Sequence, residues 1–307
     1  MVENIILANP RGYCAGVDRA IITVEKALEM YGKPVYVRHE IVHNKHVCDE
    51  LKRKGALFVE ELNEVPKGSV LILSAHGTDP KIKDNALSRF KLIDAVCPLV
   101  TKVHLEAVKY SRKDYDILLI GHKGHQEVIG TMGEADMQLI ETVSDVEHVS
   151  VKDPEKVVYL TQTTLSVDET KDIIEALKQK YPKIIMPPVG DICYATTNRQ
   201  AAVKELCKKV ELILVVGAEN SSNSVRLVET AKNLNVNAYL IPDKDAIQDE
   251  WFHNVKNVGL SSGASVPDVL VQEVIEHIQK NNKCDVETLE HIKENMTFSL
   301  PIEIREP

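Results

Sequence analysis

Short apolar runs alternate with helix-like patterns along this sequence, and the alternation restricts the fold more than any other feature. The strand-like runs are rich in β-branched residues and cover residues 5–9, 35–37, 70–73, 92–96, 117–120, 157–160, 212–216, 239–241 and 258–260. Between them, apolar residues recur at three- and four-residue steps, as at Ile21, Val24 and Leu28, which predicts helices. Strands that alternate with helices in this way predict an α/β fold with mostly parallel sheets.

Three cysteines share one setting, because each follows a strand-like run and precedes a helix-like pattern. They are Cys14, Cys97 and Cys193, and the run before the third stops at Pro187-Pro188. A thiol at the start of a helix faces backbone N–H groups, which favour its thiolate form. We therefore expect three turns to bring three thiolates to one centre.

The same cysteines divide the chain into thirds of roughly equal length, and each third repeats the strand–turn–helix plan. We expect three similar α/β subdomains at residues 1–97, 98–193 and 194–280, followed by a charged tail at residues 281–307. Ligand sites in such folds lie beyond the carboxyl ends of the strands, where the polar clusters of this sequence occur.

The cysteine spacing does not identify a metal. Three thiolates without a fourth suit zinc with an open position, or a cubane iron–sulfur cluster in which one iron lacks a protein ligand. Burial as small apolar side chains is the plain alternative for all three. It is the preferred interpretation for Cys48 and Cys207, which lie within helical patterns, and Cys284 belongs to the tail.

Composition narrows the class of protein. The chain has 307 residues, of which 44% are hydrophobic and 27% charged, which is typical of a soluble globular protein. A net charge of −9 argues against nucleic acid or an acidic membrane as a partner. No apolar run approaches the ~20 residues of a membrane span. The first residues are expected to form a strand and not a signal peptide, and the cysteines lack a disulfide-framework pattern, so a cytoplasmic location is expected.

Histidines and one glutamate occupy several of the turns that follow strands. His43, His76 and His125 each lie in such a turn, and Glu127 follows two residues after His125. A carboxyl group among histidines and thiolates could hold or deliver a proton. The alternative for Glu127 is a carboxylate at the start of a helix, and the sequence does not decide between the two.

Hydroxyl and amide side chains cluster at two expected helix starts. Ser221, Ser222 and Asn223 precede one helix, Ser265 precedes another, and Thr163 follows a strand. Helix capping is the simple explanation. Helix N-termini with clustered hydroxyls also bind phosphate, and two of them would suit a diphosphate. Neither a GxGxxG nor a GxxxxGK[ST] motif occurs, which disfavours dinucleotide-binding and P-loop folds.

Nine motifs, in this order, resemble one known family. They are GYCAGVDRA, EIVHN, SAHG, VCPLVTKVH, GHKGHQEVIGTMG, TQTTLSV, DICYATTNRQ, NSSNSVRL and SSGASVPD. Together they resemble the LytB/IspH family of 4-hydroxy-3-methylbut-2-enyl diphosphate reductases over roughly residues 4–280. Val96 departs from the family pattern, where a threonine is expected, as do Thr78 and Asp79 after SAHG.

The resemblance implies a trefoil of three subdomains around one [4Fe-4S] cluster per chain, held by Cys14, Cys97 and Cys193. It implies reduction of an allylic diphosphate to isopentenyl and dimethylallyl diphosphate, the last step of the methylerythritol phosphate pathway, with electrons from ferredoxin or flavodoxin. Glu127, Thr163 and His125 would be catalytic. The implied substrate-binding residues are His43, His76, His125, Thr163, Ser221, Ser222, Asn223 and Ser265.

Two other functions fit the same residues without the resemblance. One is a zinc-dependent hydrolase of a phosphorylated metabolite, and the other is a non-catalytic iron–sulfur sensor. Metal identity separates the reductase from the hydrolase. Glu127 separates the reductase from the sensor, because a sensor needs no acid beside a diphosphate pocket.

Overall fold

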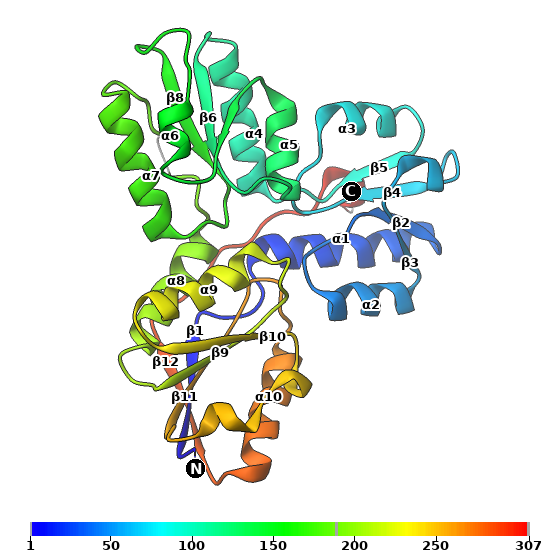
Figure 1. Ribbon diagram of the computed structural model, residues 1–307. Helices are drawn as coiled ribbons and strands as arrows, with labels where there is room; N and C mark the ends of the chain where they lie inside the picture. Colours follow the sequence, from blue (N-terminus) through cyan, green and yellow to red (C-terminus); the bar gives the residue numbers. More distant parts are fainter. Residues whose placement is uncertain (1, 188–189, 306–307) are drawn as a thin grey trace. The chain divides into compact units, whose positions relative to one another are not determined.

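The computed structural model describes residues 2–187 and 190–305, and it has three separate β-sheets flanked by helices (Figure 1). Every strand pairing among these residues is parallel. The expected α/β class with parallel sheets is therefore confirmed. Pro188, where the run before Cys193 was expected to stop, lies outside the described residues.

The five-stranded sheet has the order β10-β9-β11-β1-β12. Its strands are β1 (Asn4–Asn9), β9 (Leu212–Val216), β10 (Asn237–Ile241), β11 (Asn257–Ser262) and β12 (Asp285–Glu290). Alternate residues of β9 face opposite layers: Leu212 and Leu214 pack towards helix α10 (Asp268–Asn281). Ile213 and Val215 pack towards helices α8 (Tyr194–Leu206) and α9 (Ser222–Asn233). This burial on both faces explains why the sequence of β9 is a continuous apolar run.

The four-stranded sheet has the order β3-β2-β4-β5, with β2 (Val35–Arg38), β3 (Ala56–Val59), β4 (Val70–Leu73) and β5 (Lys91–Asp94). The connecting helices are α1 (Ala15–Tyr31), α2 (Lys45–Lys54) and α3 (Pro80–Leu87), and a short 3-10 turn lies at Leu62–Glu64. Elsewhere in the described part of the chain, 3-10 turns lie at Lys244–Ala246, Asp249–Phe252 and Ile302–Ile304. Ala86 of α3 packs with Leu71, Leu73 and Leu92 in one core cluster.

The three-stranded sheet has the order β7-β6-β8, with β6 (Asp116–Ile120), β7 (Gln138–Ile140) and β8 (Val157–Thr161). Leu118 and Ile120 face the layer of α6 (Asp145–His148) and α7 (Val167–Lys180). Ile117 and Leu119 face α4 (Pro98–Ser111) and α5 (Gln126–Glu134). Figure 1 shows the two helix layers on either side of this sheet.

The chain divides into two compact units. Unit 1 comprises Met1–Ala15, His43–Val47 and Tyr194–Met296, as far as these are described, and contains the five-stranded sheet. Unit 2 comprises Gly16–Val42, Cys48–Cys193 and Thr297–Pro307, again as far as described, and contains the other two sheets. The expected subdomain ranges 1–97, 98–193, 194–280 and 281–307 stay a prediction.

Several segments differ from the expectation for their secondary structure, and two of them, β3 and β7, are strands that were not predicted. Residues 285–290, expected as part of a charged tail, form β12, which pairs along the whole of β1. The apolar run from Ile184 is not a strand of any sheet, and only Ile185 makes an isolated bridge to Val158. A run of this length with one bridging partner gains too few ladder hydrogen bonds to act as a strand.

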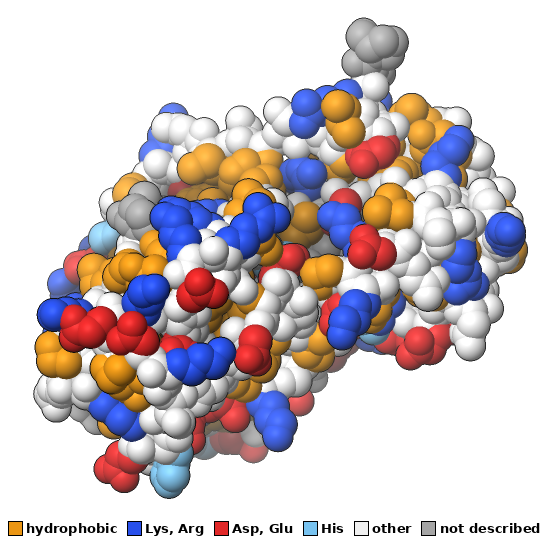
Figure 2. Space-filling model, turned by 90° about the horizontal axis from the view of Figure 1, so that it is seen from above, with side chains coloured by type: hydrophobic (Ala, Val, Ile, Leu, Met, Phe, Trp, Pro, Cys, Tyr) orange, Lys and Arg blue, Asp and Glu red, His pale blue; other side chains and the backbone are white. Residues whose placement is uncertain are grey.

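None of the helices in residues 2–187 and 190–305 has the length and apolar character that a bilayer crossing requires. The face drawn in Figure 2 carries Lys and Arg side chains interspersed with Asp and Glu.

Candidate active site

Glu127 is a buried acid in the first turn of α5. Its side chain is only 3% exposed, and its two carboxyl oxygens accept hydrogen bonds from the backbone N–H (2.6 Å) and the hydroxyl (3.0 Å) of Thr163. Loss of solvent raises the pKa of Glu127 to about 7, although the two hydrogen bonds from Thr163 oppose the increase. Near neutral pH the carboxyl group can therefore both hold and release a proton.

The helix-start interpretation of Glu127 is confirmed, and its role as an acid stays a prediction. The residue does stand at the start of a helix, but its carboxylate is turned into the protein and bonded to Thr163, which follows β8. Thr163 also accepts a hydrogen bond through its carbonyl from the backbone N–H of Cys193 (2.9 Å). One residue thus joins the buried acid to the turn that carries a cysteine.

Two histidines of unit 2 lie near each other. The rings of His76 and His125 meet edge to face, with centroids 6.1 Å apart. His125 caps α5, and its Nδ1 accepts the N–H of Glu127 at 3.2 Å, which leaves Nε2 to carry the proton and act as a donor. After His76, Gly77 adopts a φ of +88°, a left-handed conformation that favours glycine. The N–H of Cys97 donates to the carbonyl of Ala75, the residue before His76.

The remaining predicted side chains gather in unit 1. Ser221 caps α9 and is 5% exposed, and its hydroxyl accepts hydrogen bonds from the N–H and hydroxyl of Ser224. Ser222 is the first residue of that helix. Ser265 donates its hydroxyl proton to the carbonyl of His43 at 3.0 Å, which ties the loop after β11 to the His43 segment.

Asn223 and Cys14 are linked through the loop that follows β11. The Asn223 side-chain oxygen accepts the N–H of Ala264 (2.9 Å), while the Ala264 carbonyl accepts the N–H of Cys14 (3.2 Å). Gly263 precedes Ala264, and a Cβ at position 263 would collide with the Ser224 hydroxyl. Glycine therefore lets the start of α9 approach the loop closely, which the SSGAS motif signals in the sequence.

The six cysteines fall into two classes. Cys14, Cys97 and Cys193 each stand immediately before a helix, at the starts of α1, α4 and α8, as expected, and all three are half-buried and outside any disulfide. Burial raises the pKa of both Cys48 and Cys207 to about 11, and that of Cys284 is also raised. The raised pKa disfavours the thiolate form in the second class, whereas the placement of the first class fits thiolate ligands.

Cys14 belongs to unit 1, and Cys97 and Cys193 belong to unit 2. Within residues 2–187 and 190–305, no three His, Cys, Asp or Glu side chains are grouped as a metal site. The joint ligation of one cluster by the three cysteines therefore remains a prediction.

Several buried polar residues inside the motifs were not predicted to take part in the site. Gln162 is 1% exposed and accepts the N–H of His122 (3.1 Å), and Thr196 is fully buried and bonds to the Asn223 amide. Asp191, two residues before Cys193, accepts the N–H of Thr161. Each lies within a quoted motif, but nothing in its local pattern indicates that its partner is remote in sequence.

Comparison with known proteins gives a consistent result. The family described as "LytB protein" matches residues 5–279. A protein of Streptomyces avermitilis named 4-hydroxy-3-methylbut-2-enyl diphosphate reductase is 56% identical, over 99% of this chain and 91% of the relative. A protein of the same name from Actinobacillus pleuropneumoniae is 53% identical, over 98% of each chain.

Two solved structures are also similar. One is the E-1-hydroxy-2-methyl-but-2-enyl-4-diphosphate reductase of Plasmodium falciparum, with a TM-score of 0.94 and 41% identity over 99% of this chain and 97% of that one. The other is described as (E)-4-hydroxy-3-methyl-but-2-enyl diphosphate reductase, the terminal enzyme of the non-mevalonate pathway. Its TM-score is 0.65 at 35% identity, over 91% of this chain and 100% of that one.

Proposed function

The chain belongs to the LytB protein family, and on that premise we propose that it reduces (E)-4-hydroxy-3-methylbut-2-enyl diphosphate to isopentenyl and dimethylallyl diphosphate. The chain is then an oxidoreductase of isoprenoid biosynthesis. Two electrons and two protons are consumed: the C–O bond of the allylic alcohol breaks, its oxygen leaves as water, and one proton is added to the allyl carbon framework.

We assign the binding of a [4Fe-4S] cluster to Cys14, Cys97 and Cys193. The different settings of the six thiols support this choice, because only these three lie at helix starts without deep burial. When bound, the cluster would supply electrons and a Lewis-acidic iron, which assists the departure of a poor leaving group. An electron carrier, ferredoxin or flavodoxin, is the proposed donor.

Glu127 is the proposed source of the proton for the departing hydroxyl group. Its pKa of about 7 keeps a large fraction of the carboxyl protonated at neutral pH. Thr163 holds both oxygens in place, so the carboxyl group cannot rotate freely. This buried acid, attached through Thr163 to the Cys193 turn, is the observation that supports a catalytic function over a sensor.

The diphosphate is assigned to the hydroxyl, amide and imidazole groups. In unit 1 these are His43, Ser221, Ser222, Asn223 and Ser265, and in unit 2 they are His76, His125 and Thr163. The N-terminus of α9 carries the positive end of the helix dipole, which attracts an anion, and Nε2–H of His125 is a further donor. Binding through the diphosphate would orient the carbon skeleton for reaction.

The test begins with protein purified without oxygen. Iron, acid-labile sulfide and zinc are measured per chain, and turnover of the diphosphate is driven by reduced methyl viologen. Iron and sulfide near four each, as in a cubane cluster, with both products formed, are expected. Zinc without sulfide would exclude the reductase and favour the hydrolase.

The matched variants are Glu127→Gln and Glu147→Gln, the latter an exposed position on α6. Removal of a general acid typically slows turnover about 10²–10⁴-fold. We expect that loss for Glu127→Gln with the cluster retained, and none for Glu147→Gln. Full turnover in Glu127→Gln would contradict the proton-delivery role.

A further inference from the structure

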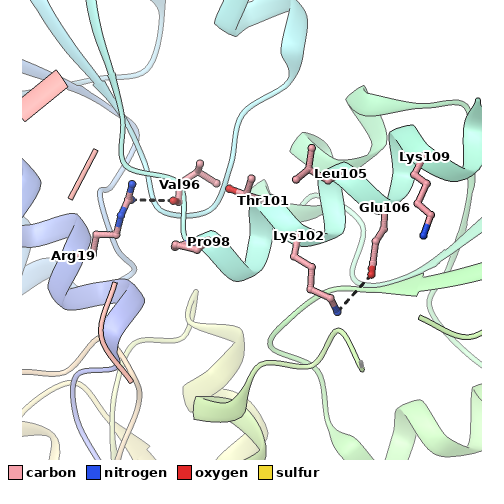
Figure 3. A pocket seen from close by; sticks show the side chains of 8 residues that line it. All are labelled: Arg19, Val96, Pro98, Thr101, Lys102, Leu105, Glu106 and Lys109. Atoms are coloured by element: carbon pink, nitrogen blue, oxygen red, sulfur yellow. Dashed lines mark hydrogen bonds and ion pairs between the residues drawn. The ribbon is translucent and has the colours of Figure 1, made fainter. Parts of the chain in front are cut away.

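A charged cluster that none of the roles above uses connects helix α4 to the turn that carries Cys193. Lys102 Nζ lies 2.9 Å from a carboxyl oxygen of Asp191 and 3.3 Å from the carbonyl oxygen of Gly190. The Asp191 side chain is completely buried, whereas Lys102 is 30% exposed. Glu106, one turn further along α4, lies 3.8 Å from Lys102, and Figure 3 shows both side chains on the same side of the helix.

The other oxygen of Asp191 fixes the turn to the sheet. It accepts the backbone N–H of Thr161, the last residue of β8, at 3.0 Å. Two residues later, the N–H of Cys193 bonds to the carbonyl of Thr163. The turn that carries Cys193 is therefore bonded to the last residue of β8, to the loop after β8 and to α4.

Helix α4 carries the second cysteine of unit 2. Cys97 is its N-cap residue, and Lys102 lies on the second turn of the same helix. An α-helix is stiff over this length, so the Lys102–Asp191 contact relates the positions of Cys97 and Cys193 directly. Arg19, Val96 and Lys102 line an open groove of about 490 Å³ along this helix, which leaves the lysine accessible at one end (Figure 3).

We propose that Lys102 is a positioning residue that fixes the Cys193 turn relative to Cys97. A completely buried carboxylate needs a cation close to it, because water no longer solvates its charge. Without Lys102, Asp191 turns towards solvent and releases the N–H of Thr161, and the Cys193 turn loosens. The consequence for catalysis rests on the proposed function, in which both cysteines hold one cluster.

The first test is amide hydrogen exchange on the full-length protein as isolated. In Lys102→Met, the amides of Thr161 and Cys193 should exchange at least about tenfold faster, as expected for losing a hydrogen bond to a charged group. Lys102→Arg should restore slow exchange. Lys109→Met is the matched control, since Lys109 is exposed, lies two turns further along α4 and lines the same groove.

The results separate positioning from general stability and from the proposed function. Unchanged exchange at Thr161 and Cys193 overturns the proposal, and so does an equal increase throughout β6 and β8. With the cluster bound, Lys102→Met should lower kcat at nearly constant KM and alter the electron paramagnetic resonance spectrum of the reduced cluster. If the exchange becomes faster at Thr161 and Cys193 in Lys102→Met but the wild type forms no product, the reductase assignment fails and the positioning role of Lys102 stands.

Discussion

Replacing Glu127 by glutamine should change how the stability of the protein depends on pH. The pKa of this carboxyl is raised from 4.5 to about 7 in the folded protein. A pKa change of one corresponds to about 1.4 kcal/mol, so the ionised carboxylate costs the folded state about 3 kcal/mol. Glutamine carries no charge at any pH and keeps an oxygen for the N–H of Thr163.

The direction follows from proton binding. Below pH 4.5 the carboxyl is protonated in both states, and its burial carries no ionisation cost. Between pH 4.5 and about 7 the unfolded chain loses the proton first, so the wild type loses stability as the pH rises. Above pH 7 both states are ionised and the loss is complete. Relative to the wild type, Glu127→Gln should therefore gain about 3 kcal/mol between about pH 4.5 and pH 8.

Urea unfolding followed by circular dichroism at about pH 4.5, 6 and 8 would measure this difference, with both proteins in the same cluster-loaded state. Other titrating groups cancel when the variant is compared with the wild type at each pH. A difference that stays constant within about 0.5 kcal/mol would refute the reasoning, because the carboxyl would then titrate near its ordinary pKa. A raised pKa also predicts that wild-type kcat falls as the pH rises through about 7, since the acid loses its proton.

Three further outcomes are expected. Cys97→Ser should lose iron and sulfide, measured per chain. Cys48→Ala should retain both, because the Cys48 thiol is buried and protonated. Equal losses in the two variants would contradict the division of the cysteines into two classes. Ser222→Ala should raise the Kd of the diphosphate in isothermal titration by up to about tenfold, as for one lost hydrogen bond, and an unchanged Kd would remove this serine from the site. Glu294→Ala should lower the free energy of unfolding by about 3 kcal/mol in urea titration, because it removes the ion-pair partner of the completely buried Arg199. A change below about 1 kcal/mol would refute that pairing.

The sequence was most informative where hydrophobic pattern and local structure agree. The apolar runs at 70–73 and 212–216 coincide with β4 and β9, and each of the three motif cysteines stands at a helix start. These features depend on neighbours within a few residues. Residues 285–290 were missed because their charged, exposed pattern has no strand signal, and only pairing with β1 makes them a strand.

The candidate site shows the same division. The residue types and their positions after strands could be read from the motifs, and so could the possibility that Glu127 acts as an acid. Its pKa could not, since that depends on burial and on the hydrogen bonds from Thr163, which is 36 residues away in sequence. Asp191 and Lys102, 89 residues apart, likewise had no detectable relationship before folding.

The sequence by itself determined the parallel α/β class, the motifs of the family and the thiols at helix starts, because periodicity and helix starts are local properties of the chain. Only the tertiary structure decided that Thr163 holds the Glu127 carboxyl, that Ala264 connects Cys14 to Asn223, and that Lys102 reaches the turn before Cys193. Desolvation and hydrogen bonding act between groups that are close in space, and folding alone brings these groups together.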